Sequence, residues 1–279
     1  MTRTRVLALC ARQELVLAVR SRWTQIFAVV FAALSLAVAA SGYILSGGSG
    51  VQDFARTAAS LVQLVLLLVP LTALLLGVLA LGSDRGTAEL LFSQPVSRGV
   101  ILCGRVLGLF QALVAAQMIG FGAAGLVIHA QSGEDGFLGF LTVIAASVVL
   151  TAVCLALAAL IAAGNVARRR SRALAIALVV WFVMVVVFDL AALGAASMLR
   201  SGSASRLLIT AALVNPVDAV RTGALLGIEG TAAFGPASLA LFRFTGGAAR
   251  AGILLAVSLL LWLVVPLALA VRRLSNADI

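Results

Sequence analysis

Few side chains in the sequence could carry out chemistry, and their types exclude most catalytic sites. The 279-residue chain has one histidine, His129, three scattered cysteines, and no lysine among its 20 basic residues. A Walker A phosphate loop and a Schiff-base site both require a lysine, and a zinc hydrolase motif requires two histidines. We therefore expect a chain that is not an enzyme and that has no metal site and no cofactor of its own.

The most informative group of polar residues lies between 82 and 105, where the sequence reads GSDRGTAELLFSQPVSRGVILCGR. Thr87 can cap a helix, Glu89 in the first turn would complement the helix dipole, and Pro95 would end the helix. A short helix held between two membrane crossings is suited to docking into a groove of a soluble partner. An ordinary polar connection is the alternative interpretation.

One acidic residue, Asp189, stands within a long apolar run. A carboxylate near the middle of a bilayer costs about 2.5 to 3.5 kcal/mol on insertion scales, so such residues face protein or a wet cavity. Two interpretations stay open. Asp189 either lines a transport path or bonds across a dimer, or it forms a structural hydrogen bond with a neighbouring helix or backbone.

The elements that must hold these residues are predominantly apolar. Hydrophobic residues make up 63% of the chain and charged residues 11%, whereas a soluble domain usually has about 25% charged residues. Six apolar runs of about 20 residues or more could each cross a bilayer. We predict an all-α integral membrane protein in which residues 1–279 form a single transmembrane domain. The predicted spans are 24–45, 58–81, 106–128, 137–163, 173–199 and 252–271.

The arginines indicate the orientation of these spans. Fourteen of the 20 fall in the N-terminal segment, the second and fourth connections and the C-terminal segment. Because cytoplasmic connections are enriched in basic residues, both termini are expected in the cytoplasm. Residues 1–23 mix apolar and basic positions, which predicts an interfacial helix with its arginines toward lipid phosphates, although a plain positive leader is the alternative. This distribution also argues against nucleic-acid binding.

Residues 200–251 are expected to form an outer, periplasmic loop with structure of its own. Short helices are predicted at 205–213 and 217–228, because Pro216 pushes Asn215 out of the α region and separates them. We interpret them as re-entrant or interfacial helices.

Two groups of residues resemble a known family. In the segment 82–105, the matching residues are Gly86, Thr87, Glu89, Leu90, Leu91, Pro95 and Arg98. They resemble the coupling segment of ABC-2-type transporter permeases. Asp189 with its neighbours, and an outer-loop motif of Asn215, Pro216, Asp218 and Arg221, are similar to the NosY branch of that family, which serves nitrous oxide reductase maturation.

The resemblance implies a non-catalytic permease of the bacterial inner membrane that pairs with itself as a homodimer. It implies two copies of a separate cytoplasmic ABC ATPase, which bind ATP and Mg, and a periplasmic partner protein. It also implies a sulfur or copper-related cargo used in copper site assembly. ABC-2 export of haem, lipid, drugs or sodium is one alternative, and a secondary transporter is another. A secondary transporter would be expected to carry several ionisable groups within its spans, and only Asp189 is present there.

Overall fold

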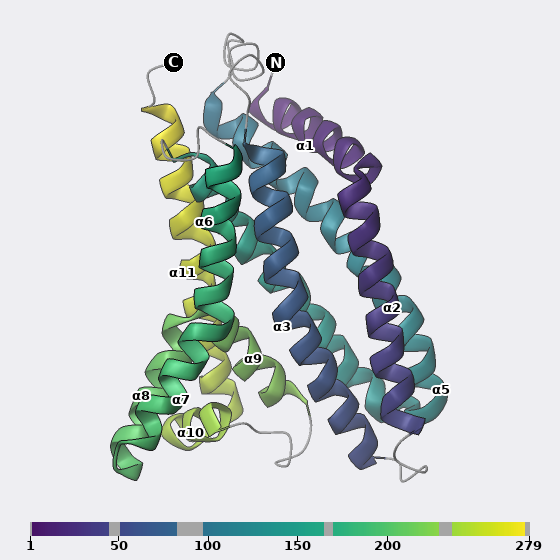
Figure 1. Cartoon of the computed structure of the whole chain (residues 1–279), viewed down its shortest axis with the longest axis vertical. Helices are drawn as coiled ribbons and strands as arrows, with labels where there is room; N and C mark the ends of the chain where they lie inside the picture. The colour runs from purple at the N-terminus through teal and green to yellow at the C-terminus, as the bar shows by residue number, and fades with distance from the viewer. Residues whose placement is uncertain (1, 45–50, 83–96, 165–169, 229–235, 277–279) are drawn as a thin grey trace.

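A computed structural model of the chain describes residues 2–44, 51–82, 97–164, 170–228 and 236–276. Every regular element in these ranges is a helix, in the order shown in Figure 1. The elements are α1 (Arg3–Arg20), α2 (Arg22–Ile44), α3 (Val51–Leu81), α5 (Arg98–Ala162), α6 (Arg170–Phe182), the π-helix η2 (Val183–Val187), α7 (Phe188–Ser197), α8 (Ser201–Val214), α9 (Pro216–Gly227), α10 (Pro236–Thr245) and α11 (Ala248–Ser275).

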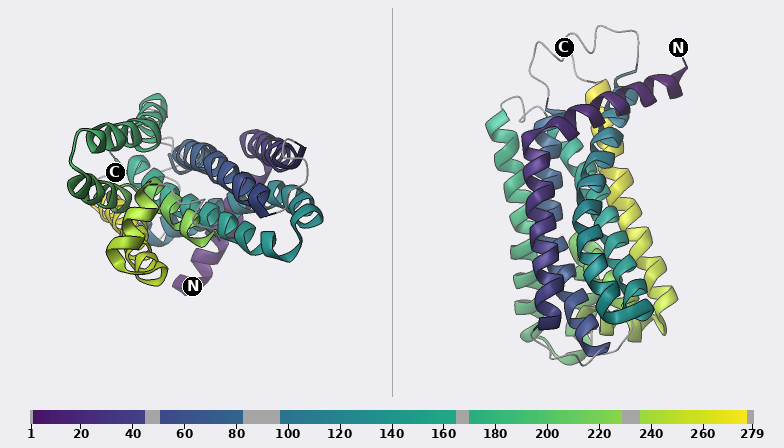
Figure 2. Two further views of the ribbon diagram at one scale, coloured as in Figure 1. Left: turned by 90° about the horizontal axis from the view of Figure 1, so that it is seen from below. Right: turned by 90° about the vertical axis from the view of Figure 1, so that its right-hand side faces the viewer.

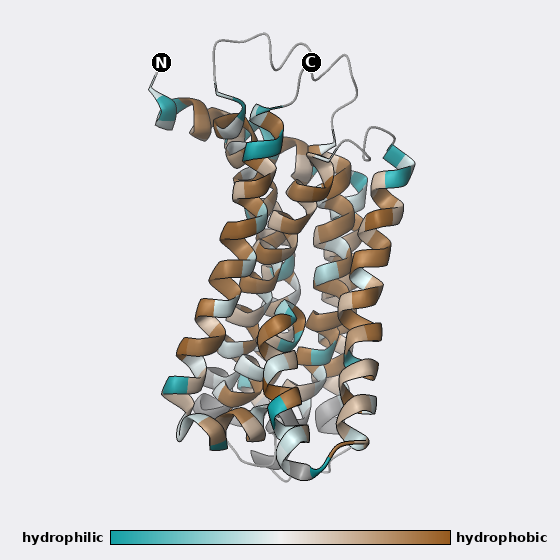
Figure 3. Cartoon of the chain, turned by 90° about the vertical axis from the view of Figure 1, so that its left-hand side faces the viewer, coloured by the Kyte–Doolittle hydropathy of each residue, from teal (hydrophilic) through white to brown (hydrophobic). Residues whose placement is uncertain are grey.

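Six helical segments are long and apolar enough to cross a membrane, which confirms the predicted fold class. They are Arg22–Ser41, Thr57–Leu81, Arg98–Ala130, Gly139–Ala162, Arg170–Ser197 and Ala248–Ser275. Each overlaps one predicted span and differs from it by a few residues at the ends. Hydrophobic residues cover most of the length of the bundle, as Figure 3 shows. A helix suits this environment because it satisfies its backbone hydrogen bonds internally.

The helix α5 supplies two of these spans because it folds back on itself. Gln117 in its first half donates a hydrogen bond to Thr151 in its second half at 2.8 Å, and Ser147 donates to the Gln117 side chain at 2.7 Å. Phe121 and Phe140 meet across the same seam with ring centroids 5.8 Å apart. The residues between the two spans, 131–138, join them at one end of the bundle.

The core is centred on α3 and α5. The helix α5 packs against α1, α2, α3 and α11, and α3 also contacts α2 and α6. A row of aromatic rings joins α2 to both halves of α5. The ring centroid of Phe31 lies 5.5 Å from that of Phe27 and 5.1 Å from that of Phe121. Such contacts fix helix spacing where lipid supplies no hydrophobic driving force between spans.

The two ends of the bundle differ in structure. At one end, α1 lies across the spans, as the right-hand view in Figure 2 shows, and α11 ends there as well. The location of α1 at a membrane interface stays a prediction. At the opposite end, α8, α9 and α10 gather beside α7 and the first part of α11. The break predicted at Asn215–Pro216 is confirmed, since α8 ends at Val214 and α9 begins at Pro216. The sequence analysis does not predict α10, although Pro236 at its first position is a common helix start.

Candidate coupling elements and outer polar cluster

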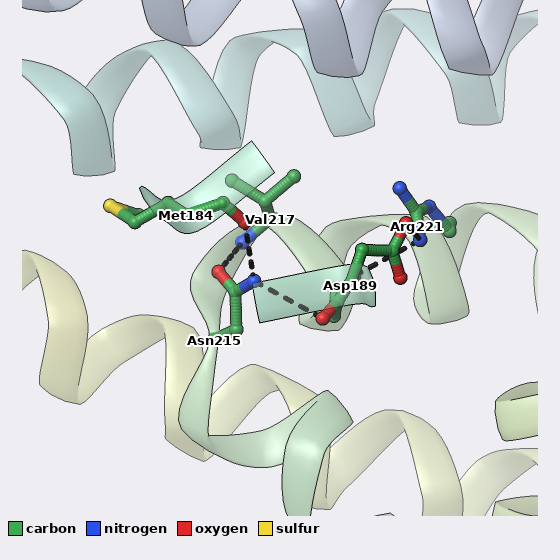
Figure 4. A network of polar contacts seen from close by, with 6 residues as sticks. Met184, Asp189, Asn215, Val217 and Arg221 are labelled. Carbon is green, nitrogen blue, oxygen red and sulfur yellow. Dashed lines mark hydrogen bonds and ion pairs between the residues drawn. The ribbon is translucent and has the colours of Figure 1, made fainter. Parts of the chain in front are cut away.

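Four residues that the sequence analysis places in two separate motifs lie together in the structure. Asp189 of α7 and Asn215, Asp218 and Arg221 at α9 form what we call the outer polar cluster (Figure 4). The Nη1 of Arg221 donates to Asp189 Oδ2 at 2.7 Å and lies 3.1 Å from Asp218 Oδ1. One guanidinium therefore joins the span that contains Asp189 to the outer helix α9.

Asn215 anchors the start of α9 and connects it to the π-helix. Its side-chain oxygen accepts a hydrogen bond from the Val217 N–H at 3.1 Å, which caps the helix. Its Nδ2 donates to the Met184 carbonyl at 2.7 Å and to Asp218 Oδ2 at 3.1 Å. An amide side chain can donate two hydrogen bonds and accept another at the same time, whereas a hydroxyl group has a single O–H to donate. The Met184 carbonyl lies in η2, and the wider π turn is often found at functional sites.

Of the two interpretations of Asp189, the structure supports a structural contact within the chain. Its carboxylate forms a structural ion pair within the chain, and it is still 31% exposed in the single chain. A contact with another copy therefore stays possible as a prediction. Within the described residues, the buried Nε of Arg221 has no hydrogen-bond partner. Sequence reasoning missed the pairing of the two motifs, although a carboxylate in an apolar run is often paired with a cation, and Arg221 lies one helical turn beyond Asp218.

Asp218 is expected to make stability depend on pH. It lies in α9, outside the six candidate spans, and burial raises its pKa to about 6 even though Arg221 opposes the shift. Asp189, Arg221 and Asn215 are the other groups that act on it. Because the folded pKa is above the unfolded value of about 3.9, the folded state binds this proton more tightly. The contribution of Asp218 to stability should therefore increase as pH falls from about 6 to about 4, and stay constant above that window.

The measurement is the thermal unfolding temperature of the purified protein at pH 4.5 and pH 7.5, for the wild type and for Asp218→Asn. The difference in unfolding temperature between the two proteins should change with pH. Relative to Asp218→Asn, the wild type should be more stable at pH 4.5 than at pH 7.5. Parallel pH profiles for the two proteins would contradict the assignment.

At the opposite end, two glycines of α5 let α1 approach closely. A Cβ added at Gly104 would lie 2.7 Å from Cys10 Cβ, and one added at Gly108 would lie 2.9 Å from Glu14 Cβ and against the carbonyl oxygen of Ala11. The spacing of Gly104 and Gly108 predicts a close approach of another helix, and the structure identifies that helix as α1. Small residues at this spacing commonly let helix backbones come together.

Replacing Gly108 with alanine should therefore displace α1. Overpacking of this kind costs about 1 to 3 kcal/mol, and it should appear as a lower unfolding temperature. The matched control is Gly122→Ala in the same helix, where an added Cβ has no atom within 4 Å among the described residues. That variant should be neutral or slightly stabilising, because alanine favours a helix over glycine. Equal unfolding temperatures for the two variants would refute the close packing of α1.

Two arginines at the start of α5, where the predicted coupling segment ends, contact three other helices. Arg105 Nε donates to Glu14 Oε2 at 2.9 Å, and its Nη2 donates to the Ala80 carbonyl near the end of α3. Arg98 Nη1 donates to the Leu274 carbonyl in the last turn of α11 at 3.1 Å. Carbonyls in the last turn of a helix lack partners within the helix, so cations bind them favourably. The start of α5 is thus tied to α1, to the end of α3 and to the end of α11.

The remaining predicted coupling residues lie outside the described residues. These are Gly86, Thr87, Glu89, Leu90, Leu91 and Pro95, so their role stays a prediction. Arg98 is the one member of the set that the structure places, at the first residue of α5. Arg105 and Glu14, which the sequence analysis does not select as site residues, hold the same region together.

A contact in the middle of the bundle connects α3 to the span that contains Asp189. Trp181 Nε1 of α6 donates to the Leu67 carbonyl of α3 at 3.1 Å. Pro70 lies within α3 close to this carbonyl, and a proline removes one helical hydrogen bond and weakens the helix locally. The contact with α6 therefore lies at a point where α3 can bend.

Comparison with known proteins gives a family for this arrangement. A family model described as an ABC-2 family transporter protein matches residues 8–279. A probable ABC transporter permease protein NosY from Pseudomonas aeruginosa is 38% identical over 236 residues, which cover 82% of this chain and 85% of that protein. A protein of the same description from Stutzerimonas stutzeri is 38% identical over 227 residues, covering 79% and 82%. Since the family match extends over nearly the whole sequence, the chain belongs to the ABC-2 family of transporter proteins.

Proposed function

We propose that the chain is the membrane-spanning permease subunit of an ABC transporter, driven by a separate cytoplasmic ATPase that docks on the segment 82–105. The observation that carries this proposal is the position of that segment. It connects two central spans, α3 and α5, and Arg98 and Arg105 at the start of α5 contact α1, the end of α3 and the end of α11. The whole sequence has no lysine for a Walker A loop, so this chain needs an ATPase from another polypeptide.

The proposed mechanism is a displacement carried along packed helices. Closure of the ATPase pair would push on the segment 82–105, and Arg105 would pass the displacement to the end of α3 and to α1. The Trp181 contact would carry it from α3 to α6. The Asn215 contact with Met184 and the Arg221 contact with Asp189 would then move α9. Coupling of this kind requires elements with two discrete arrangements, and the π-helix η2 between α6 and α7 is a candidate for the one that changes.

The protein is proposed to act as a homodimer that pairs through the face of α6 and α7. The span they form has the smallest buried share of the six candidate spans. Large apolar side chains on it, such as Val179, Phe182 and Leu190, are 49% to 67% exposed in the single chain. The partly exposed ion pair of Asp189 lies on the same span, and a second copy would cover it more favourably than lipid.

The proposed cargo and the other partners follow from the similarity to the two NosY proteins. By that similarity, the transporter would move a sulfur or copper-related species across the inner membrane for the maturation of nitrous oxide reductase, with both of its termini cytoplasmic and with a periplasmic partner at the α8–α10 end. ATP and Mg would be bound by the ATPase. Another ABC-2 cargo, such as haem, lipid, a drug or sodium, would leave the coupling mechanism unchanged.

The experiment that tests the proposal changes two residues of the coupling segment. Glu89→Ala combined with Leu91→Ala should abolish co-purification of the ATPase from membranes, while the permease is still inserted in normal amounts. The matched control is Glu134→Ala with Leu138→Ala, which removes the same two side-chain types between the two spans of α5 at the other end of the bundle. It should retain the ATPase. Retention of the ATPase by the Glu89 and Leu91 variant would count against the docking segment.

A further inference from the structure

Two cavities lie along α3, the larger between α2, α3 and α6, and the smaller between these helices, α1 and α5. They adjoin, because their walls share Trp23, Leu76 and Leu79. Their volumes are about 560 Å³ and about 480 Å³. The helix α3 contacts both α2 and α6 and forms the floor between them. We call the larger cavity the apolar groove and the smaller one the polar mouth.

The apolar groove is suited to hydrocarbon and not to water. Its walls come from aliphatic and aromatic side chains of three helices, including Val30 of α2, Leu75 of α3 and Leu178 of α6. Thr72 is the polar exception, and its hydroxyl already donates to the Leu68 carbonyl of its own helix at 2.7 Å. A water molecule in a cavity needs about two to four polar partners, which these walls do not provide.

The length of the apolar groove matches one leaflet of a bilayer. Along α3 it extends from Leu68 to Leu79, which is about 16 Å at a rise of about 1.5 Å per residue. The hydrocarbon core of a bilayer is about 30 Å thick, so each leaflet contributes about half of that. The groove begins beside Trp23, at the end of the bundle that carries α1, and a tryptophan commonly lies at the level of lipid headgroups.

The polar mouth is suited to an anion. Glu14, Arg105 and Arg170 line it, together with the hydroxyl residues Ser21 and Thr24. The charge of Glu14 is matched by Arg105 at 2.9 Å, so Arg170 gives the mouth a net positive charge. Arg170 is exposed and is the first residue of α6, where the helix dipole also favours negative charge.

We propose that this site binds one anionic phospholipid from the leaflet nearest α1. Its phosphate lies at the polar mouth beside Arg170, and one acyl chain lies in the apolar groove against α3. A single amphiphile meets both requirements, an anionic head and an apolar tail of one-leaflet length, which neither a free phosphate nor a neutral lipid does. The bound chain would support α6 against α3. The lipid belongs to the inner leaflet if the orientation given under the proposed function holds, but the site itself does not depend on an ATPase.

Native mass spectrometry of the purified chain tests this proposal. The protein is exchanged into an equimolar mixture of phosphatidylglycerol and phosphatidylcholine with identical acyl chains, and the ratio of retained lipids is measured. The wild type should retain phosphatidylglycerol about fivefold more than phosphatidylcholine, the size expected for one arginine acting on an anionic lipid. Arg170→Gln should lower this ratio to about one. The matched control, Arg243→Gln, removes an exposed arginine from α10 at the other end of the bundle and should keep the wild-type ratio.

A second variant tests the acyl chain independently of charge. Leu75→Trp fills the apolar groove with a side chain that is tolerated next to lipid, and it should reduce the retained amount of both lipids. An equal retention of the two lipids by the wild type would overturn the proposal. A preference that persists in Arg170→Gln, or unchanged lipid retention in Leu75→Trp, would also overturn it. None of these outcomes bears on ATPase docking, because no ATPase is present in the assay.

Discussion

Replacing Arg221 with leucine is expected to destabilise the protein by about 3 kcal/mol, the lower end of the cost of removing one partner from a buried ion pair, because the pair with Asp189 is partly exposed. The guanidinium lies between two carboxylates, at 2.7 Å from Asp189 and 3.1 Å from Asp218, and its side chain is 20% exposed. Without it, both carboxylates would stay in apolar surroundings with no cation beside them. The measurements are the unfolding temperature in detergent and the yield of monodisperse protein, both of which should fall sharply.

Two further variants isolate the cause of that loss. Arg206→Leu removes an exposed arginine from α8 and should change the free energy of unfolding by no more than about 0.5 kcal/mol, so the unfolding temperature should stay close to that of the wild type. Adding Asp189→Asn and Asp218→Asn to Arg221→Leu removes the unpaired charges, so this triple variant should recover much of the lost stability. If Arg221→Leu is as stable as Arg206→Leu, the outer polar cluster does not hold α7 and α9 together.

A loss of similar size is expected for Arg105→Leu at the other end of the bundle. Glu14 is 6% exposed and Arg105 is its partner at 2.9 Å, so the variant would leave a buried carboxylate unpaired, at a cost of about 3 to 5 kcal/mol. It would also free the Ala80 carbonyl at the end of α3. Because α1 is held by this contact and by its packing on Gly104 and Gly108, we expect α1 to separate from α5.

Maleimide labelling of Cys10 measures that separation directly. Cys10 lies on α1, is half-buried, and would contact a side chain added at Gly104. In a background of Cys103→Ser and Cys154→Ser, Arg105→Leu should raise the labelling rate of Cys10. Arg12→Leu, which removes an exposed arginine from the same helix, should not change it. Adding Glu14→Gln to Arg105→Leu should lower the labelling rate of Cys10 again. If Arg105→Leu alone leaves the labelling rate unchanged, α1 is held in another way.

The parts of the fold that depend on local sequence were predictable. Spans of about 20 apolar residues are required by the thickness of a bilayer, and the break between α8 and α9 follows from Pro216 alone. Both can be recognised within a short window of sequence. The existence of α10 was missed because its ten residues form too short and too mixed a pattern to distinguish a helix from a loop.

The contacts that define the site depend on long-range packing, which no short window contains. Arg221 and Asp189 are separated by 32 residues, and Arg105 and Glu14 by 91. The residue types gave a partial signal, because a carboxylate in an apolar run is often paired with a cation, but several arginines could have been that partner. The partner of the Gly104 and Gly108 pair was unpredictable for the same reason, since the spacing indicates close packing without identifying the helix that packs there.

The central claim is that a separate ATPase docks on the segment 82–105, and a cross-link from residue 89 tests it most directly. This chain has no lysine, so, apart from its N-terminal amine, a reagent that joins a cysteine to an amine side chain can link it only to another protein. With the three native cysteines replaced by serine, Glu89→Cys in membranes should cross-link to the ATPase, and Glu134→Cys at the other end of the bundle should not. No product from position 89, or an equal yield of the ATPase product from position 134, would contradict the account.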